Sequence, residues 1–319
     1  MTGPNNGGAG NPSGRAGNVA VRQIEDVPFV ERETGPLLLD LVLPEGRGPF
    51  PVVLWLHGGG WFTGDRKLRP DLRRFFAERG FAMASADYRL SGQAPFPAQL
   101  FDVRSAVRFL RREAGRYGLD PEAIGAWGAS AGGHLAALAG LTGGRPVLDG
   151  EPESGDARVQ AVSDGYGPVD LAAVVAAGAE SAPPQLSGAN APEARLLGGP
   201  PAELPELAER ASPLSYVSGG APPFHILHGT ADALVPHGQS ELLHDALVRA
   251  GASSELYLID GFGHGFLNPA GTSDLDRVMD FGHLEAAPGA PAELRTARGS
   301  SRVGVSFDLI GDFFAQHLR

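Results

Sequence analysis

Cysteine is absent from this chain of 319 residues. Its absence excludes disulfides, thiolate metal sites, iron–sulfur clusters and a cysteine nucleophile. Positive charge is also scarce, because 26 Lys and Arg stand against 37 Asp and Glu and give a formal net charge of −11. Nucleic acids and anionic membranes are bound through basic patches, so we expect neither as a main partner.

Long hydrophobic runs are missing as well. The longest stretch without a charged residue, 123–144, is rich in glycine and contains Ser130 and His134, which predicts a buried strand and a buried helix rather than a membrane span. Residues 1–17 have no apolar h-region, so we do not expect a Sec signal peptide. Their Gly, Asn and Pro content predicts a disordered N-terminal tail. On these grounds we expect a cytoplasmic protein.

Apolar residues nevertheless make up 42% of the chain, enough for a large buried core. Apolar runs of strand length alternate with helical patterns, and the run VVLWL at 52–56 is apolar on both faces, as in strands covered on both sides. The alternation predicts an α/β fold with a mostly parallel, doubly wound sheet of about eight strands, in one domain over 18–319. Strands are expected at 37–42, 51–57, 81–87, 123–128, 159–164, 224–228 and 255–259.

The clearest helical pattern spans 99–116, with an apolar stripe that begins at Leu100. Asp120 followed by Pro121 is typical of a helix N-cap with proline at the first helical position. Four arginines fall mostly on the side opposite the apolar stripe, and we expect them to form a solvated helix face: Arg104, Arg108, Arg111 and Arg112.

Two long segments interrupt the alternation. Residues 172–212, rich in Ala, Pro and Gly, are too long for a simple connection and predict a lid-like insertion. Residues 268–302 form an extra insertion before the last helix, for which a lid, a binding loop and disordered surface all stay open.

The motif Gly-Ala-Ser-Ala-Gly at 128–132 follows a predicted strand and opens a predicted helix. In this context G-x-S-x-G places the serine on a sharp turn above the sheet, where its hydroxyl is exposed. Free N–H groups at the start of the helix favour the negative charge that develops there. We therefore interpret Ser130 as a nucleophile. The alternative is a capping serine at a glycine-rich helix start.

A second glycine-rich segment, HGGGW at 57–61, directly follows a predicted strand. Consecutive glycines let backbone N–H groups turn into a cleft, as acyl transfer requires for its tetrahedral oxyanion. We expect the N–H groups of Gly58 and Gly59 to form an oxyanion hole, with that of Ala131 as the third donor. Alone, the segment would also suit a flexible turn or an anion-binding nest, and the serine motif favours the oxyanion hole.

A serine nucleophile needs a base, and the base needs an orienting carboxylate. After a serine on such a turn, the expected chain order is acid and then histidine. Asp232 and His264 each follow the end of a predicted strand, where ligands bind in open α/β sheets. We predict Asp232 as the acid and His264 as the base. Weaker candidates for the acid are Asp260, Asp274 and Asp276. We expect His228, at the end of its strand, to support the turn that carries Asp232.

Metal and nucleotide motifs are lacking. The chain contains no H-E-x-x-H and no Walker loop, so we expect no metal and no cofactor. A pair formed by His57 and His134 is a weaker metal candidate, and we interpret His134 as packed within the serine-bearing helix.

The motifs together resemble a known family. In chain order they are HGGGW, DYRL, WGASAGGHLAAL, GPVDL, HGTADALVP and GFGHGF. They resemble the α/β-hydrolase esterases related to hormone-sensitive lipase, and most closely the branch of bifunctional feruloyl and acetyl-xylan esterases. The similarity covers roughly residues 20–267 and the last helix. Two departures are the insertion at 268–302 and the lack of a helical N-terminal cap.

This resemblance implies an α/β-hydrolase fold and carboxylester hydrolysis, with Ser130, Asp232 and His264 as the triad. It also implies that Trp61 and Tyr166 line the acyl pocket, although ordinary core packing would equally account for both. We expect a serine hydrolase that cleaves short-chain acyl (acetyl or aryl) esters of small molecules. The alternatives are a peptidase or amidase of the prolyl-oligopeptidase or formamidase type and, less favoured, a non-catalytic ligand-binding α/β-hydrolase. The sequence leaves a homo-oligomer open.

Overall fold

The computed structural model describes residues 20–144, 150–178, 187–269 and 282–319. The predicted tail at 1–17 lies outside them. The strands are β1 Val21–Arg32, β2 Gly35–Pro44, β3 Phe50–Leu56, β4 Ala82–Ala86, β5 Leu119–Ala129, β6 Ala161–Gly165, β7 Phe224–Gly229, β8 Ser254–Ile259, β9 Ala290–Thr296 and β10 Gly299–Val305. The helices are α1 Leu72–Phe75, α2 Ala98–Arg112, α3 Ala114–Tyr117, α4 Ala131–Thr142, α5 Leu171–Gly178, α6 Pro192–Leu197, α7 Pro205–Ala211, α8 Gly238–Arg249 and α9 Asp308–Leu318.

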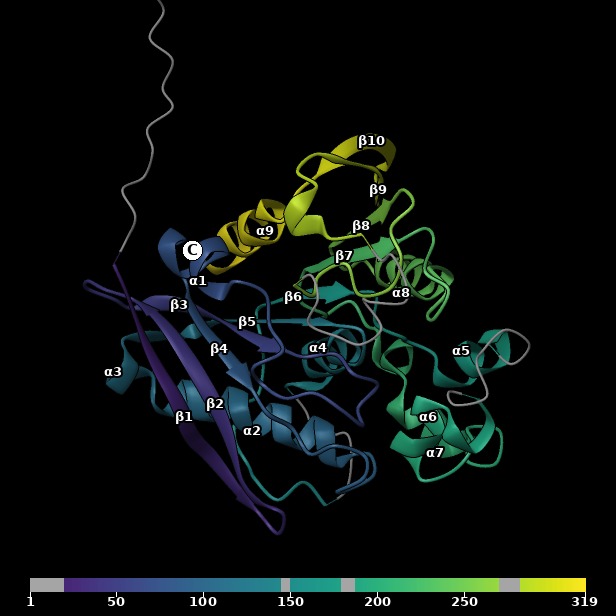
Figure 1. The fold of residues 1–319 in the computed structure, drawn as a ribbon, viewed down its shortest axis with the longest axis horizontal. Helices are drawn as coiled ribbons and strands as arrows, with labels where there is room; N and C mark the ends of the chain where they lie inside the picture. The colour runs from purple at the N-terminus through teal and green to yellow at the C-terminus, as the bar shows by residue number, and fades with distance from the viewer. Residues whose placement is uncertain (1–19, 145–149, 179–186, 270–281) are drawn as a thin grey trace, which may run out of the picture.

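One sheet contains all ten of these strands, in the order β1-β2-β4-β3-β5-β6-β7-β8-β9-β10. The six strands from β4 to β8 in this order are parallel to one another. The predicted α/β fold with a mostly parallel sheet is therefore confirmed, with ten strands instead of about eight. Antiparallel pairs extend both edges, β1–β2 on one side and β9–β10 on the other (Figure 1).

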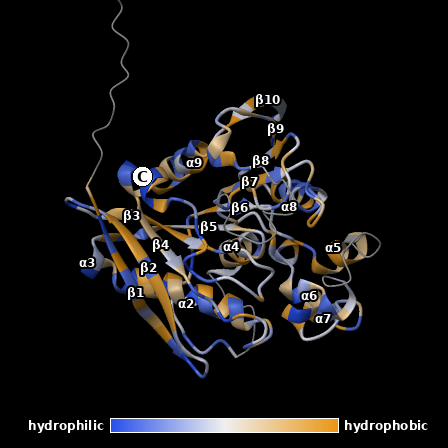
Figure 2. Ribbon diagram, in the orientation of Figure 1, coloured by the Kyte–Doolittle hydropathy of each residue, from blue (hydrophilic) through white to orange (hydrophobic). Residues whose placement is uncertain are grey.

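Helices cover both faces of the sheet and bury a core on each. On one face α2 and α4 pack against the central strands, and α8 packs against β7 and β8. On the other face α9 crosses β5 and β6, and Phe314 joins a cluster with Trp55 and Trp127, whose ring centroids lie 4.3 Å apart. Figure 2 shows β2 and β3 coloured largely as hydrophobic. Burial on both faces explains why the central strands read as continuous apolar runs.

The arginines of α2 are not a solvated face, so that prediction was wrong for most of them. Arg104 and Arg108 are 3% and 9% exposed, and both pair with the Glu151 carboxylate at 2.7 Å. Arg111 donates to the carbonyl oxygens of three residues in two other segments of the chain. Only Arg112 is exposed. The segment around Glu151 lies over this side of the helix, and helical periodicity carries no information about so distant a partner.

The helix expected to begin at Pro121 does not exist, because Asp120 and Pro121 belong to β5. The Asp120 carboxylate accepts the N–H of Glu122 at 2.9 Å. An aspartate that accepts a nearby backbone N–H gives the same sequence pattern as a helix N-cap, although the chain here continues as a strand. The stretch 123–144 is a strand followed by a helix, as predicted.

Both expected insertions contain regular structure in their described parts. Residues 172–212 include most of α5 and all of α6 and α7. At 268–302, the described residues form β9 and the start of β10, which continue the sheet from β8. No helix in the described ranges combines the length and the apolar composition that a membrane crossing needs.

Candidate active site

Ser130 lies on the turn between β5 and α4 in a backbone conformation that non-glycine residues rarely adopt, with φ 56° and ψ −121°. Its N–H donates to the Gly165 carbonyl at 2.7 Å. The flanking glycines are required by space. An added Cβ would lie 2.2 Å from a backbone oxygen at Gly128 and 2.0 Å from the Leu56 oxygen at Gly132. The turn therefore holds the serine in a fixed, strained position at the edge of the sheet.

Two other predicted residues lie beside this serine. His264 Nε2 is 2.8 Å from Ser130 Oγ, and His264 Nδ1 is 2.7 Å from Asp232 Oδ2. Because β5, β7 and β8 are parallel, the loops that follow them meet at one edge of the sheet. The structure thus brings together three side chains that lie far apart in the sequence. Of the competing acids, Asp260 pairs with Arg302 at an exposed position, and residues 274 and 276 lie outside the described ranges.

Four N–H groups surround the Asp232 carboxylate. The backbone amides of Leu234 and Val235 donate to Oδ1 at 2.9 Å each, while His264 and His228 lie 2.7 and 3.1 Å from Oδ2. Burial alone would raise the pKa of Asp232. The neighbouring His264 and the hydrogen bonds from both imidazoles outweigh burial and hold that pKa well below its usual range. The carboxylate is therefore charged at neutral pH.

The glycine-rich segment borders the serine. A Cβ added at Gly58 would lie 3.4 Å from Ser130 Cβ. Gly59 has φ 108°, and a side chain there would collide with the Thr63 carbonyl. Among the described residues, no acceptor pairs with the backbone N–H of Gly58, Gly59 or Ala131. These amides are therefore available to a ligand beside the serine.

Trp61 and Tyr166 are both fully buried. Trp61 packs edge-on against His134 and donates its Nε1–H to His134 Nδ1 at 3.2 Å. The Tyr166 ring packs against His264, with centroids 4.8 Å apart, and against Phe266. Tyr166 therefore borders the imidazole of His264 directly, whereas the Trp61 side chain contacts His134 on α4.

Asp164, at the end of β6, was not among the predicted site residues. It is fully buried, and burial raises its pKa to about 6. Its Oδ1 accepts the N–H of Gly167, and a Cβ at Gly133 would lie 2.3 Å from that oxygen. Asp164 thus shapes the turn whose Gly165 carbonyl holds the serine N–H. The only trace of this role in the sequence is the segment DGYG after a predicted strand. It has no periodicity or motif spacing that would distinguish it from an ordinary turn.

The two histidines of the weaker metal candidate have backbone partners. Nδ1 of His57 lies 2.7 Å from the Gly58 oxygen, and Nε2 of His134 lies 2.7 Å from the Ala211 oxygen. Burial lowers the pKa of both histidines. Within the described ranges no group of three or more His, Asp or Glu is placed to hold a metal ion.

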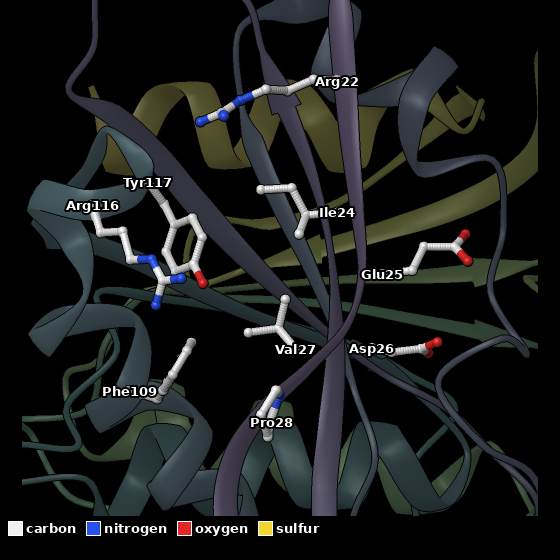
Figure 3. Close-up of a pocket in the computed structure, with 9 residues that line it drawn as sticks. All are labelled: Arg22, Ile24, Glu25, Asp26, Val27, Pro28, Phe109, Arg116 and Tyr117. Atoms are coloured by element: carbon white, nitrogen blue, oxygen red, sulfur yellow. The ribbon is translucent and has the colours of Figure 1, made fainter.

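A surface cavity of about 450 Å³ lies elsewhere, beside β1 and the α2–α3 region (Figure 3). Its lining includes Arg22, Phe109, Arg116 and Tyr117 and none of the predicted site residues. Nothing in its geometry connects it to the serine.

Comparison with known proteins gives concordant results. Residues 39–247 match the BD-FAE family. Esterase LipQ of Mycobacterium tuberculosis is 36% identical over 208 residues, which cover 65% of this chain and 48% of LipQ. A solved carbohydrate esterase from gut microbiota, in truncated form, is 33% identical with a TM-score of 0.66, over 78% of this chain and 90% of that one. Butyrate-bound esterase 2 of Thermogutta terrifontis is 26% identical with a TM-score of 0.62, over 83% and 91%.

The curated relatives are longer proteins. This chain spans about half the length of three curated esterase relatives, from 48% to 53%. The two solved esterases described above, by contrast, are matched over about nine-tenths of their length.

Proposed function

Because the chain belongs to the BD-FAE family of hormone-sensitive lipase-like α/β-hydrolases, we propose that it is a serine carboxylesterase that hydrolyses short-chain acyl esters through an acyl-serine intermediate. The observation that carries the proposal is the hydrogen-bonded series Ser130–His264–Asp232, with distances of 2.8 and 2.7 Å. Serine, imidazole and carboxylate in this order form the constellation that activates a serine hydroxyl for acyl transfer.

In the first step, Ser130 Oγ attacks the ester carbonyl carbon while its proton passes to His264 Nε2. Asp232 keeps the other proton on Nδ1, so that Nε2 is free to accept, and stabilises the imidazolium that forms. The carbonyl oxygen becomes an oxyanion. We assign its stabilisation to the N–H groups of Gly58, Gly59 and Ala131, each worth on the order of 3 kcal/mol in the transition state.

Collapse of the tetrahedral intermediate breaks the ester C–O bond, and His264 returns its proton to the leaving alcohol. The product of this half-reaction is an acyl-Ser130 ester. Water then attacks the acyl carbon with His264 as base, a second oxyanion forms in the same place, and the free acid leaves as the serine regains its proton. No cofactor takes part in either half-reaction.

Two observations support the preference for short acyl groups. Tyr166 is buried against His264, so its large ring limits the space beside the imidazole. Among the solved relatives, one is a carbohydrate esterase and another has butyrate bound. A small-molecule ester with a short acyl group fits both observations.

The direct test is Ser130→Ala, assayed with short p-nitrophenyl esters. We expect kcat to fall roughly 10⁴–10⁶-fold with the fold retained. Ser301→Ala, at an exposed position of β10, serves as the control and should keep wild-type activity. A fluorophosphonate probe should label the wild type and the control and leave Ser130→Ala unlabelled. Near wild-type hydrolysis by Ser130→Ala would remove Ser130 from the mechanism.

A pair of matched ester and anilide substrates separates esterase from amidase activity. Amide cleavage needs efficient protonation of the leaving amine, whereas an alcohol leaves more readily. We expect kcat/KM for the ester to exceed that for the anilide. A higher value for the anilide would replace the esterase proposal with a peptidase or amidase. An acyl-chain series from acetyl to hexanoyl, together with feruloyl and acetylated-sugar esters, would then define the substrate class.

A further inference from the structure

We propose that His228 is a positioning residue of this site, and that Ser240 fixes its imidazole as the neutral Nε2–H tautomer, which holds the Asp232 carboxylate in place for His264. The inference rests on the proposed function, because positioning matters only if Asp232 orients a catalytic base. It extends the triad by two residues that contact neither the substrate nor the reacting atoms.

The contacts of His228 determine which nitrogen carries the hydrogen. The ring is fully buried at the end of β7. Its Nε2 lies 3.1 Å from Asp232 Oδ2 and 2.9 Å from the Val235 carbonyl oxygen. A carboxylate and a carbonyl are acceptors only, so Nε2 must be the donor to both. The Nε2–H of His228 therefore links the Asp232 carboxylate to the Val235 carbonyl, at the end of the turn that begins with Asp232.

The other nitrogen meets a hydroxyl. His228 Nδ1 lies 2.7 Å from Ser240 Oγ, at the start of α8. Ser240 is fully buried, and in the described part of the chain its hydroxyl has no other hydrogen-bond partner. A buried hydroxyl that donates to nothing is costly, so Ser240 donates to Nδ1. With Nδ1 accepting and Nε2 donating, the ring is neutral and has a single tautomer.

The effect on Asp232 is both geometric and electronic. Oδ2 receives one N–H from each imidazole, and Oδ1 receives two backbone amides, so the carboxylate has little freedom to rotate. The His228 hydrogen bond also draws electron density from the oxygen that faces His264. Without it, Asp232 would stabilise a protonated His264 more strongly, and activity would fall off at a higher pH on the acid side.

The other charged group facing His228 is Asp164 of β6, which interacts with it electrostatically. The Tyr166 ring lies edge-on to the imidazole, with centroids 6.4 Å apart. Because the two groups interact, loss of the imidazole also affects Asp164, and Ser240→Ala, which keeps the imidazole, is the variant that leaves this interaction in place.

The chain offers a matched control pair. His244 Nδ1 lies 2.9 Å from Ser254 Oγ, and both residues are buried between α8 and β8. This pair repeats the His–Ser contact of His228 and Ser240 and touches none of the proposed catalytic residues. Replacement of either member tests what the loss of a buried His–Ser hydrogen bond does by itself.

The first experiment compares His228→Leu, His228→Gln and His244→Gln in esterase assays from pH 4 to 9. We expect His228→Leu to lower kcat by about 10–100-fold, with KM changed less than about twofold, because the base is misplaced after substrate binds. Its acid-side decline should move to higher pH. The amide introduced by His228→Gln can donate to Asp232, so this variant should recover most of kcat. His244→Gln should match the wild type in kcat and in pH profile.

Ser240→Ala covers the case in which His228→Leu does not fold. It removes one oxygen atom and leaves the ring free to take the Nδ1–H tautomer, which is unable to donate to Asp232. We expect a loss of kcat smaller than that of His228→Leu and in the same direction. Ser254→Ala, its control, should keep kcat.

Proton-coupled ¹⁵N spectra of histidine-labelled protein read the tautomer without any activity measurement. The signal assigned to His228, by its disappearance in His228→Gln, should show a neutral ring protonated on Nε2. A neutral ring protonated on Nδ1, or a charged ring, would overturn the inference.

The outcomes keep the two proposals apart. If the wild type hydrolyses no ester, the proposed function fails and the spectra still decide the tautomer. If the wild type is active but His228→Leu and Ser240→Ala behave like the His244 and Ser254 variants, the role of His228 is refuted and the esterase proposal stands.

Discussion

Asp232 and Asp102 are both buried aspartates whose carboxylates accept several hydrogen bonds. Asp102, on α2, is fully buried and receives the Arg32 Nε–H at 2.8 Å and both side-chain and backbone N–H groups of Arg89 at 2.8–3.0 Å. Asp232 receives two imidazoles and two backbone amides. Burial and the number of donors do not distinguish them.

The chemistry of the hydrogen-bond donors distinguishes Asp232 from Asp102. A guanidinium stays protonated throughout the physiological pH range, so the pair of arginines on Asp102 forms fixed ion pairs that join β1, the loop after β4 and α2. An imidazole gains and loses a proton near neutral pH, and His264 has its second nitrogen on a serine hydroxyl. Asp102 can therefore only stabilise the fold, whereas Asp232 can act on a proton transfer at Ser130.

The largest expected effect is that of Asp232→Asn on activity. An amide can donate to His264 Nδ1 and so favours the wrong tautomer, and we expect kcat to fall by roughly 10⁴-fold. Stability should change far less than activity, because the backbone amides still hold Oδ1. Steady-state kinetics with a short p-nitrophenyl ester, together with urea unfolding of the same preparation, measures both quantities. An Asp232→Asn protein with wild-type kcat would exclude Asp232 as the acid.

Asp102→Asn should show the opposite pattern. Loss of the charge leaves Arg32 and Arg89 without their buried counterion, and we expect the free energy of unfolding to fall by about 3–5 kcal/mol. The folded fraction should keep its kcat, since among the described residues the Asp102 carboxylate accepts hydrogen bonds only from Arg32 and Arg89 and contacts none of the proposed catalytic residues. Glu113→Gln, which removes a surface ion pair with Arg112, is the control and should cost less than about 1 kcal/mol. If both variants lost a similar free energy of unfolding, the buried ion pairs of Asp102 would stabilise the fold no more than an exposed ion pair does.

The same contrast explains how far the sequence could be interpreted. The central strands were predictable because apolar runs such as 52–56 are buried on both faces. The proximity of Ser130, Asp232 and His264 was predictable because each follows a strand, and strand ends in a parallel sheet converge. In both cases a local pattern carries the information.

The unpredicted features depend on partners distant in sequence. β1 was missed because it carries charges and Pro28 on a sheet edge, with register shifts near Asp26 that break the alternation. β9 and β10 were missed because most of their residues are partly or fully exposed. The burial of Arg104 and Arg108 depends on Glu151, and no period in α2 encodes that contact.

The smallest expected effect is a pH dependence of stability that comes from two buried histidines. Unlike Asp102, neither histidine has, within the residues that the structure describes, a charged partner that stabilises its ionised form. Burial lowers the pKa of His134 to about 4 and that of His225 to about 3. The unfolded chain binds a proton at each near pH 6.5, while the folded protein does so only near those lower values, so unfolding takes up protons and stability falls as pH drops from about 6.5 toward 4. Between pH 7 and pH 5, each histidine should lower the free energy of unfolding by on the order of 1–2 kcal/mol.

Urea unfolding of the wild type and of His225→Gln across this pH range measures the contribution of one histidine. The free energy of unfolding of the glutamine variant should fall less steeply as the pH drops. Equal slopes would show that His225 is protonated at similar pH in both states, and the pH dependence would then have to come from other groups.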